Sequence, residues 1–87
     1  MNIGKAIAEI RKENKKKQVV LAEESGISAV SMCNIERGRV VPSFSTIETI
    51  AKKLGVSTGY LIFRSLEDDD IKKEKIEDFH VLRKLIL

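Results

Sequence analysis

Few residues in this 87-residue chain could do acid–base, nucleophilic or metal chemistry. The chain holds one His, His80, one Cys, Cys33, and no Trp. It contains no GxxxxGKS/T or GxGxxG phosphate loop and no HExxH metal motif. A single cysteine excludes an internal disulfide and a four-cysteine zinc site. We therefore expect neither an enzyme nor a bound metal or other cofactor.

Basic side chains are the other candidates, because clustered Lys and Arg attract phosphate groups. Residues 1–63 hold ten Lys and Arg against six Asp and Glu, whereas residues 64–87 hold six against seven. Two basic runs, Lys15-Lys16-Lys17 and Arg37-Gly38-Arg39, lie where breaks between helices are expected. Charge alone leaves a polyanionic partner and an ordinary solvated loop surface equally open, and it is the placement of the two runs that points to a polyanion.

The elements that must position these residues are helices. Apolar residues recur at helical spacing, and no segment alternates apolar and polar residues as a strand would. Five helices are expected over roughly residues 2–13, 18–25, 29–36, 44–54 and 57–63. The expected N-caps are Asn2, Ser28, Ser43 and Ser57. The fourth helix is expected to bury Phe44, Ile47, Ile50, Ala51 and Leu54.

The spacing within residues 18–37 is that of a helix-turn-helix unit. Two helices that cross at a steep angle need a small residue at the crossing, which Ala22 supplies, and a turn residue that tolerates positive φ, which Gly26 supplies. Apolar residues must also flank the turn and face inward from the second helix. Four residues meet these demands: Leu21, Ile27, Met32 and Ile35.

With these residues in place, the sequence resembles the phage-repressor (Cro/cI-type, or XRE-type) helix-turn-helix family over about residues 2–63. The matching segments are Gln18–Ser28, Ile35–Gly38, Pro42-Ser43 and Ala51–Ser57. The resemblance implies an all-α, five-helix, lambda-repressor-like DNA-binding bundle that acts as a dimer on a palindromic operator. We expect this domain over residues 1–63, and an acidic linker with a C-terminal amphipathic helix over residues 64–87.

Carried over by position, the resemblance implies roles on double-stranded DNA. The third helix would lie in the major groove, with Ala29, Val30 and Asn34 facing base edges. Asn34 has the chemistry to pair with adenine, and Ala29 or Val30 to touch a thymine methyl group. The implied phosphate contacts are Lys16, Lys17, Gln18, Ser28, Arg37, Arg39, Ser43 and Ser45. Arg11 and Glu36 match an ion pair that joins the first and third helices.

The last segment, residues 71–87, is expected to form a sixth helix with a wide apolar arc. This arc comprises Ile71, Ile76, Phe79, Leu82, Leu85 and Ile86. Pairing with a second copy in a homodimer and packing against the fifth helix are both open, and the arc is wide enough for both.

The leading hypothesis is a sequence-specific transcriptional regulator, more specifically a repressor. The alternative is a protein-interaction module, such as an anti-repressor or an antitoxin-like protein, acting through residues 64–87. No segment has the length or composition of a membrane span or signal peptide. We expect a cytoplasmic protein, bacterial or phage-encoded, with no membrane partner and no small-molecule substrate.

Overall fold

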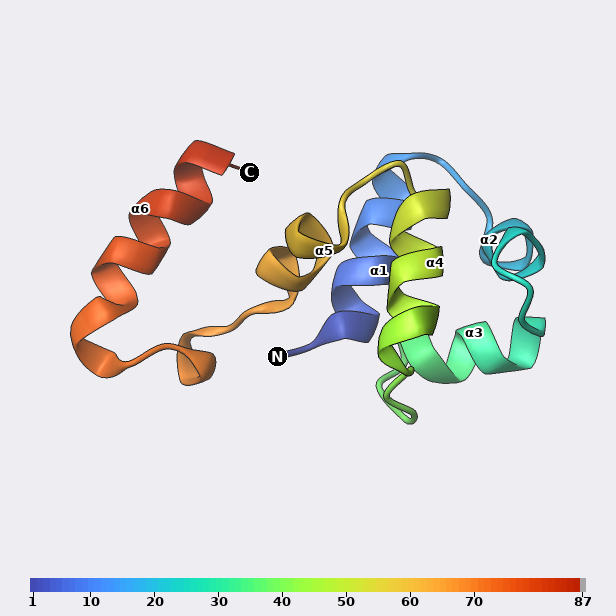
Figure 1. Ribbon diagram of the computed structural model, residues 1–87, viewed down its shortest axis with the longest axis horizontal. Coiled ribbons are helices and arrows are strands. Elements are labelled where there is room, and N and C mark those ends of the chain that lie inside the picture. Colours follow the sequence, from blue (N-terminus) through green and yellow to red (C-terminus); the bar gives the residue numbers. More distant parts are fainter. Residues whose placement is uncertain (87) are drawn as a thin grey trace.

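The computed structural model describes residues 1–86, in which there are helices and no strands (Figure 1). The helices are α1 (Ile3–Glu13), α2 (Gln18–Glu24), α3 (Ala29–Glu36), α4 (Phe44–Lys53), α5 (Thr58–Ser65) and α6 (Ile76–Ile86). Two short 3-10 turns, η1 (Asp68–Asp70) and η2 (Lys73–Lys75), precede α6. The expected all-α fold with an additional C-terminal helix is confirmed; position 87, the last of the expected sixth helix, lies outside the described residues.

The N-caps predicted from the sequence are found at the starts of four helices. Each of four helices begins after a side chain that accepts a hydrogen bond from a backbone N–H three residues on, which satisfies a donor that the helix itself cannot pair. These N-caps are Asn2, Ser28, Ser43 and Ser57, as expected. At α2 the N-cap position is Lys17, whose side chain makes no capping hydrogen bond.

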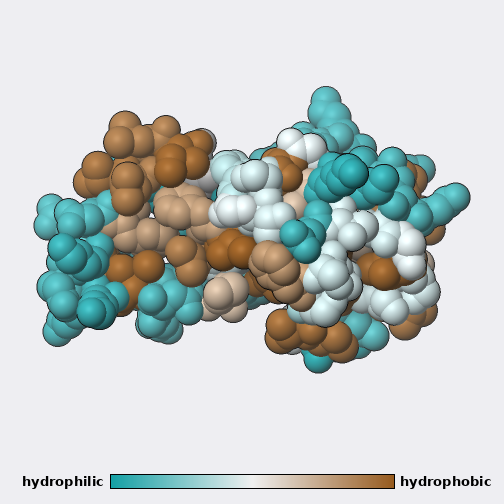
Figure 2. Space-filling view, viewed as in Figure 1, coloured by the Kyte–Doolittle hydropathy of each residue, from teal (hydrophilic) through white to brown (hydrophobic). Residues whose placement is uncertain are grey.

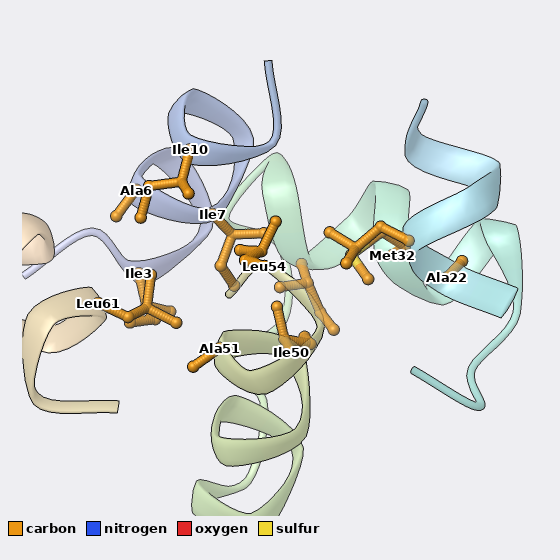
Figure 3. Packing of buried hydrophobic residues seen from close by; sticks show 12 residues of the cluster. Ile3, Ala6, Ile7, Ile10, Ala22, Met32, Ile50, Ala51, Leu54 and Leu61 are labelled. Carbon is orange, nitrogen blue, oxygen red and sulfur yellow. The ribbon is translucent and has the colours of Figure 1, made fainter. Parts of the chain in front are cut away.

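The core lies where α1, α3, α4 and α5 meet, and α2 covers one side of it. Its largest fully buried side chains are Ile7, Leu21, Met32, Ile50 and Leu61. Figure 3 shows Ile7 of α1 gathered with Ile50 of α4 and with Leu54, the residue that follows α4, in the middle of this cluster. Burial of these apolar side chains fixes α3 against the bundle, because Met32 and Ile35 form its inner face.

The expectation for Phe44 is wrong. This side chain is 60% exposed, whereas Ile50 and Ala51 of α4, and Leu54 at its C-terminal end, are buried as expected. Phe44 opens α4 at the edge of the bundle, directly after a loop in which Val40 and Val41 are also exposed (Figure 1). Helical periodicity put Phe44 on the inner face, but no neighbouring element covers the first turn of α4.

The sixth helix begins at Ile76, five residues later than expected. Glu67 and Asp70 form a reciprocal capping box around η1, and Ile71 then adopts an extended backbone. Ile71 therefore does not lie on the helical arc to which the sequence pattern assigned it. The physical reason is that the acidic run pairs side chains with its own backbone N–H groups, which stabilises a short turn instead of a continuous helix.

α6 lies apart from the five-helix bundle, at the opposite end of the long axis from α2 and α3 (Figure 1). The molecule measures 41 × 23 × 19 Å along its principal axes. One aromatic contact holds α6 near the bundle: the rings of Phe63 and Phe79 meet edge to face, with centroids 5.7 Å apart. Arg83 strengthens this junction, because its guanidinium lies 5.7 Å from the Phe79 ring and donates to the Leu66 carbonyl.

Candidate nucleic-acid interface

The turn between α2 and α3 has the geometry that the sequence spacing predicts. Ala22 is buried at the crossing, and Gly26 adopts φ +72°. The amide of Ile27 donates to the Ala22 carbonyl at 3.0 Å, and the amide of Gly26 donates to the Glu23 carbonyl at 3.1 Å. These bonds close the end of α2 and direct the chain into α3. The helix-turn-helix unit is therefore present over residues 18–36.

α3 has one buried side and one open side. Met32 and Ile35 face the core, so the residues about half a turn away face outward. Val30 is 72% exposed, Ala29 is exposed, and Asn34 is half-buried. Asn34 borders a groove of about 220 Å³ between α3 and the start of α4. Of the three residues expected to face bases, two are thus open to solvent and one is partly sheltered.

A polar network fixes α3 to the rest of the bundle. Arg11 Nε donates to Glu36 Oε2 at 2.8 Å, and Arg11 Nη2 donates to Glu36 Oε1 at 3.0 Å. The two side chains are only 12% and 6% exposed. Gln18 Nε2 also donates to Glu36 Oε1, at 2.9 Å, so α1, α2 and α3 meet at one carboxylate. Such a two-pronged, charge-assisted contact fixes orientation as well as distance.

Two of the residues expected to bind phosphate make internal contacts. Gln18 is part of the Glu36 network, and Lys16 Nζ donates to Glu24 Oε1 at 2.6 Å and to the Lys53 carbonyl at 2.9 Å. Lys16 thereby caps the C-terminal end of α4 together with Asn14, whose side-chain amide donates to the Leu54 carbonyl. Sequence reasoning missed this cap, because its partners are about 40 residues away along the chain.

The other expected phosphate contacts lie open on the surface. Lys17, Arg37 and Arg39 are exposed, and no ion pair within residues 1–86 involves them. Ser28 and Ser43 cap α3 and α4, so their hydroxyls already accept a backbone N–H. Ser45 is exposed on the first turn of α4. Lys17, Arg37 and Arg39 thus add positive charge at the start of α2 and just after α3, and Ser28 and Ser43 mark the N-terminal ends of α3 and α4.

The expected apolar arc of the C-terminal helix is divided between two surroundings. Phe79 is buried against Phe63, and Ile71 and Ile76 are half-buried. Further along α6, three residues of the arc are exposed: Leu82 at 50%, Leu85 at 78% and Ile86 at 51%. Val81, next to them on α6, is exposed as well. Figure 2 shows apolar side chains gathered over the α6 end of the molecule.

Gly4 is a positioning residue that the sequence analysis missed. A Cβ placed on Gly4 would lie 2.0 Å from the carbonyl oxygen of Ile35, so only glycine lets α1 approach the end of α3 this closely. The available signal was a glycine inside the apolar pattern of α1, where glycine normally weakens a helix.

Within residues 1–86, no group of three or more His, Cys, Asp and Glu side chains is placed to hold a metal ion. None of the helices in this part of the chain is both long and apolar enough to span a bilayer.

Comparison with protein families places the helix-turn-helix unit within a known domain. Residues 4–64 match the family described as helix-turn-helix domain. The chain belongs to this family. The resemblance to phage repressors is also supported by an immunity repressor protein of Bacillus phage phi105, which is 40% identical over 77 residues. That match covers 88% of this chain and 51% of the phage protein, so the chain spans about half the length of this relative.

Solved structures share the fold. The biofilm master regulator SinR, in a crystal structure with DNA, is 33% identical with a TM-score of 0.65, covering 69% of this chain and 97% of that one. ClgR, the clp gene regulator of Corynebacterium glutamicum, has a TM-score of 0.72 at 20% identity, covering 98% of this chain and 83% of ClgR. A SinR/SinI complex chain has a TM-score of 0.64 at 24% identity, covering 95% of each chain. The last two similarities concern the fold alone.

Proposed function

We propose that this chain is the DNA-binding part of a transcriptional repressor, and that α3 enters the major groove of duplex DNA. The observation that carries the proposal is the open side of α3, held in place by the Arg11–Glu36–Gln18 network. Exposed Lys17, Arg37 and Arg39, which take part in no ion pair within residues 1–86, supply positive charge at the start of α2 and just after α3. Two relatives support the proposal: SinR, solved in complex with DNA, and the phage phi105 immunity repressor. A DNA partner implies a cytoplasmic, nucleoid-associated location in a bacterial cell.

In this complex, base contacts and phosphate contacts come from different parts of the surface. Ala29, Val30 and Asn34 face base edges. Phosphates are bound mainly by Lys17, Arg37, Arg39 and the first turn of α4 at Ser43 and Ser45. Gln18 and Lys16 contribute through donors that remain free of their internal bonds, a second amide N–H on Gln18 and a third ammonium N–H on Lys16. Ser28 contributes by turning its hydroxyl, which donates to Ser31 Oγ in the free protein, toward a phosphate.

We further propose that the chain acts as a homodimer joined through α6. The exposed stripe of Leu82, Leu85 and Ile86 has no cover within the described protomer. α6 begins with Glu77 and Asp78 and ends with Arg83 and Lys84. Two copies packed antiparallel therefore bring the acidic start of each helix beside the basic end of the other. Such a dimer reads a palindromic operator with half-sites about 34 Å apart, or a multiple of that.

The exposed α6 stripe also suits a second function, binding of a different protein by an anti-repressor or antitoxin-like module. Such a module has no need for basic groups around α3, whereas a DNA-binding protein does. The two functions therefore differ in whether Lys17, Arg37 and Arg39 contribute to binding of the partner.

The experiment is a selection of bound fragments from random duplex DNA, followed by a salt titration of binding to the selected duplex. The four basic side chains assigned to phosphates, Lys16, Lys17, Arg37 and Arg39, predict a log–log slope of roughly −3 to −4 per subunit. Replacing Lys17, Arg37 and Arg39 by Gln should reduce the slope by about 1 for each residue. The matched control replaces Lys72, Lys73 and Lys75 in the linker and should leave it unchanged. Failure to select any sequence, or equal effects of the two sets, would refute the proposal.

A further inference from the structure

The first turn of α3 exposes Ala29, Val30 and Ser31, so its open face carries two apolar side chains and no charge, which is unusual for a surface that binds a polyanion. Ala29 and Val30 lie on the first turn of α3, and Cys33 and Asn34 follow one turn later on the same side as Val30. Val30 is 72% exposed, whereas Met32 and Ile35, the apolar residues of α3 that face the core, are buried. No charged side chain of α3 lies between Ser28 and Ile35.

The hydroxyl groups at the start of α3 are engaged with one another. Ser28 Oγ accepts the Ser31 amide at 3.0 Å and donates to Ser31 Oγ at 2.9 Å. The one amide side chain on this face, Asn34, is half-buried beside the groove at the start of α4. The most prominent group that α3 can insert into a groove is therefore the isopropyl group of Val30.

The edges of base pairs in the major groove offer one apolar group, the C5 methyl of thymine. This methyl is the largest apolar contact there, because the C5 hydrogen of cytosine is smaller and the remaining edge groups are hydrogen-bond donors and acceptors. Cys33 is half-buried, as Asn34 is, and adds a smaller apolar surface next to Val30, since a thiol is a weak hydrogen-bonding group and packs as a small apolar side chain.

We propose that Val30, with Cys33 behind it, selects operator half-sites through the C5 methyl groups of thymine, so that binding depends on those methyl groups. The inference rests on the proposed function and goes further, because it names the chemical group on the DNA that sets specificity. It assigns the main discriminating contact to van der Waals packing and not to hydrogen bonding by Asn34.

The test compares two versions of the duplex selected above, one with thymine and one with deoxyuridine at every thymine position. This exchange removes the methyl groups and leaves the Watson–Crick hydrogen bonds in place. Wild-type protein should bind the deoxyuridine duplex about fourfold more weakly for each contacted methyl, from the free energy of burying one apolar carbon. Affinities are measured by fluorescence anisotropy at one salt concentration.

A variant separates the contact from any general effect of deoxyuridine on the duplex. Val30→Ala shortens an exposed side chain and should fold normally, as circular dichroism would verify. It should bind the thymine duplex more weakly than wild type and show a thymine-to-deoxyuridine affinity ratio close to one. Val81→Ala, which shortens another exposed valine, on α6 at the other end of the molecule, should keep the wild-type ratio.

The outcomes distinguish this inference from the proposed function. Sequence-specific binding with equal affinity for the two duplexes, or an unchanged ratio in Val30→Ala, would overturn methyl reading and leave the DNA-binding function intact. A selected consensus without A·T pairs would overturn it as well. If no duplex is selected at all, both proposals fail.

Discussion

Gly4 of α1 lies directly against the carbonyl oxygen of Ile35 at the end of α3. A Cβ on Gly4 would lie 2.0 Å from that oxygen. It would also lie 3.0 Å from the Ile35 carbonyl carbon and 3.1 Å from the Glu36 carbonyl oxygen. Backbone atoms cannot move aside as a flexible side chain can. This contact therefore sets how closely α3 approaches α1.

Gly4→Ala should destabilise the protein although alanine is the better helix former. The added methyl must push α3 away from α1, and overpacking of this kind costs about 1–3 kcal/mol. Gly59→Ala is the matched control, because Gly59 also lies within a helix but a Cβ there meets nothing within 4 Å. It should stabilise the protein by about 0.5 kcal/mol. Urea unfolding measures both, and a stabilised Gly4→Ala would contradict the close approach.

Glu36 should matter far more to stability than an exposed glutamate does. Glu36→Gln removes the charge that receives hydrogen bonds from Arg11 and Gln18, and it leaves a largely buried guanidinium poorly paired. We expect a loss of about 2–3 kcal/mol and a melting temperature lower by about 10 °C or more.

Glu23→Gln on α2 is the control for Glu36. Glu23 is exposed, and no ion pair within residues 1–86 involves it. Its replacement should change stability by less than about 0.5 kcal/mol. Equal changes in melting temperature for the two variants would show that the Arg11–Glu36 contact does not hold α3 in place.

The features that could be predicted from the sequence are those set by neighbours along the chain. The N-caps at Ser28 and Ser43 and the left-handed Gly26 depend on residues within four positions, so composition and spacing suffice to find them. The helix-turn-helix unit follows from such local features, because its two helices are joined by a short turn.

The features that could not be predicted depend on what lies across the fold. Periodicity assigned Phe44 to the core, but the α4 edge has no covering element. Gly4 and the contact of Lys16 with the Lys53 carbonyl involve partners more than 30 residues away. Ile71 was assigned to a helix because periodicity does not register that the preceding carboxylates pair with their own backbone.

The proposed dimer predicts that a charge on the exposed side of α6 will separate the protomers. Leu85 is 78% exposed, so Leu85→Glu should leave the monomer folded while it removes apolar area from the α6 pair and places a carboxylate there. Sedimentation equilibrium should show a shift from dimer to monomer. Val41→Glu is the control, since Val41 is 82% exposed in the loop before α4. A monomer with Val41→Glu and a dimer with Leu85→Glu would move the interface to that loop.

The contact between Glu13 and Arg64 predicts how stability depends on pH. Arg64 Nη1 and Nη2 each donate to a Glu13 carboxylate oxygen at 2.7 Å, which joins the end of α1 to α5. Hydrogen bonding to this guanidinium lowers the pKa of Glu13 below its ordinary value of 4.5. A carboxylate with a lowered pKa in the folded state stabilises that state above its unfolded pKa, and the stabilisation disappears as the pH falls through the folded pKa.

Glu13→Gln should therefore be less stable than wild type at neutral pH and equally stable in sufficiently acidic solution. The difference in the free energy of unfolding should be largest above about pH 5 and should shrink as Glu13 becomes protonated in the wild-type protein. Urea unfolding between neutral and acidic pH measures this difference. Glu48→Gln, an exposed position on α4, supplies the control. A difference between Glu13→Gln and wild type that stays constant with pH would show that the contact does not depend on the charge of Glu13.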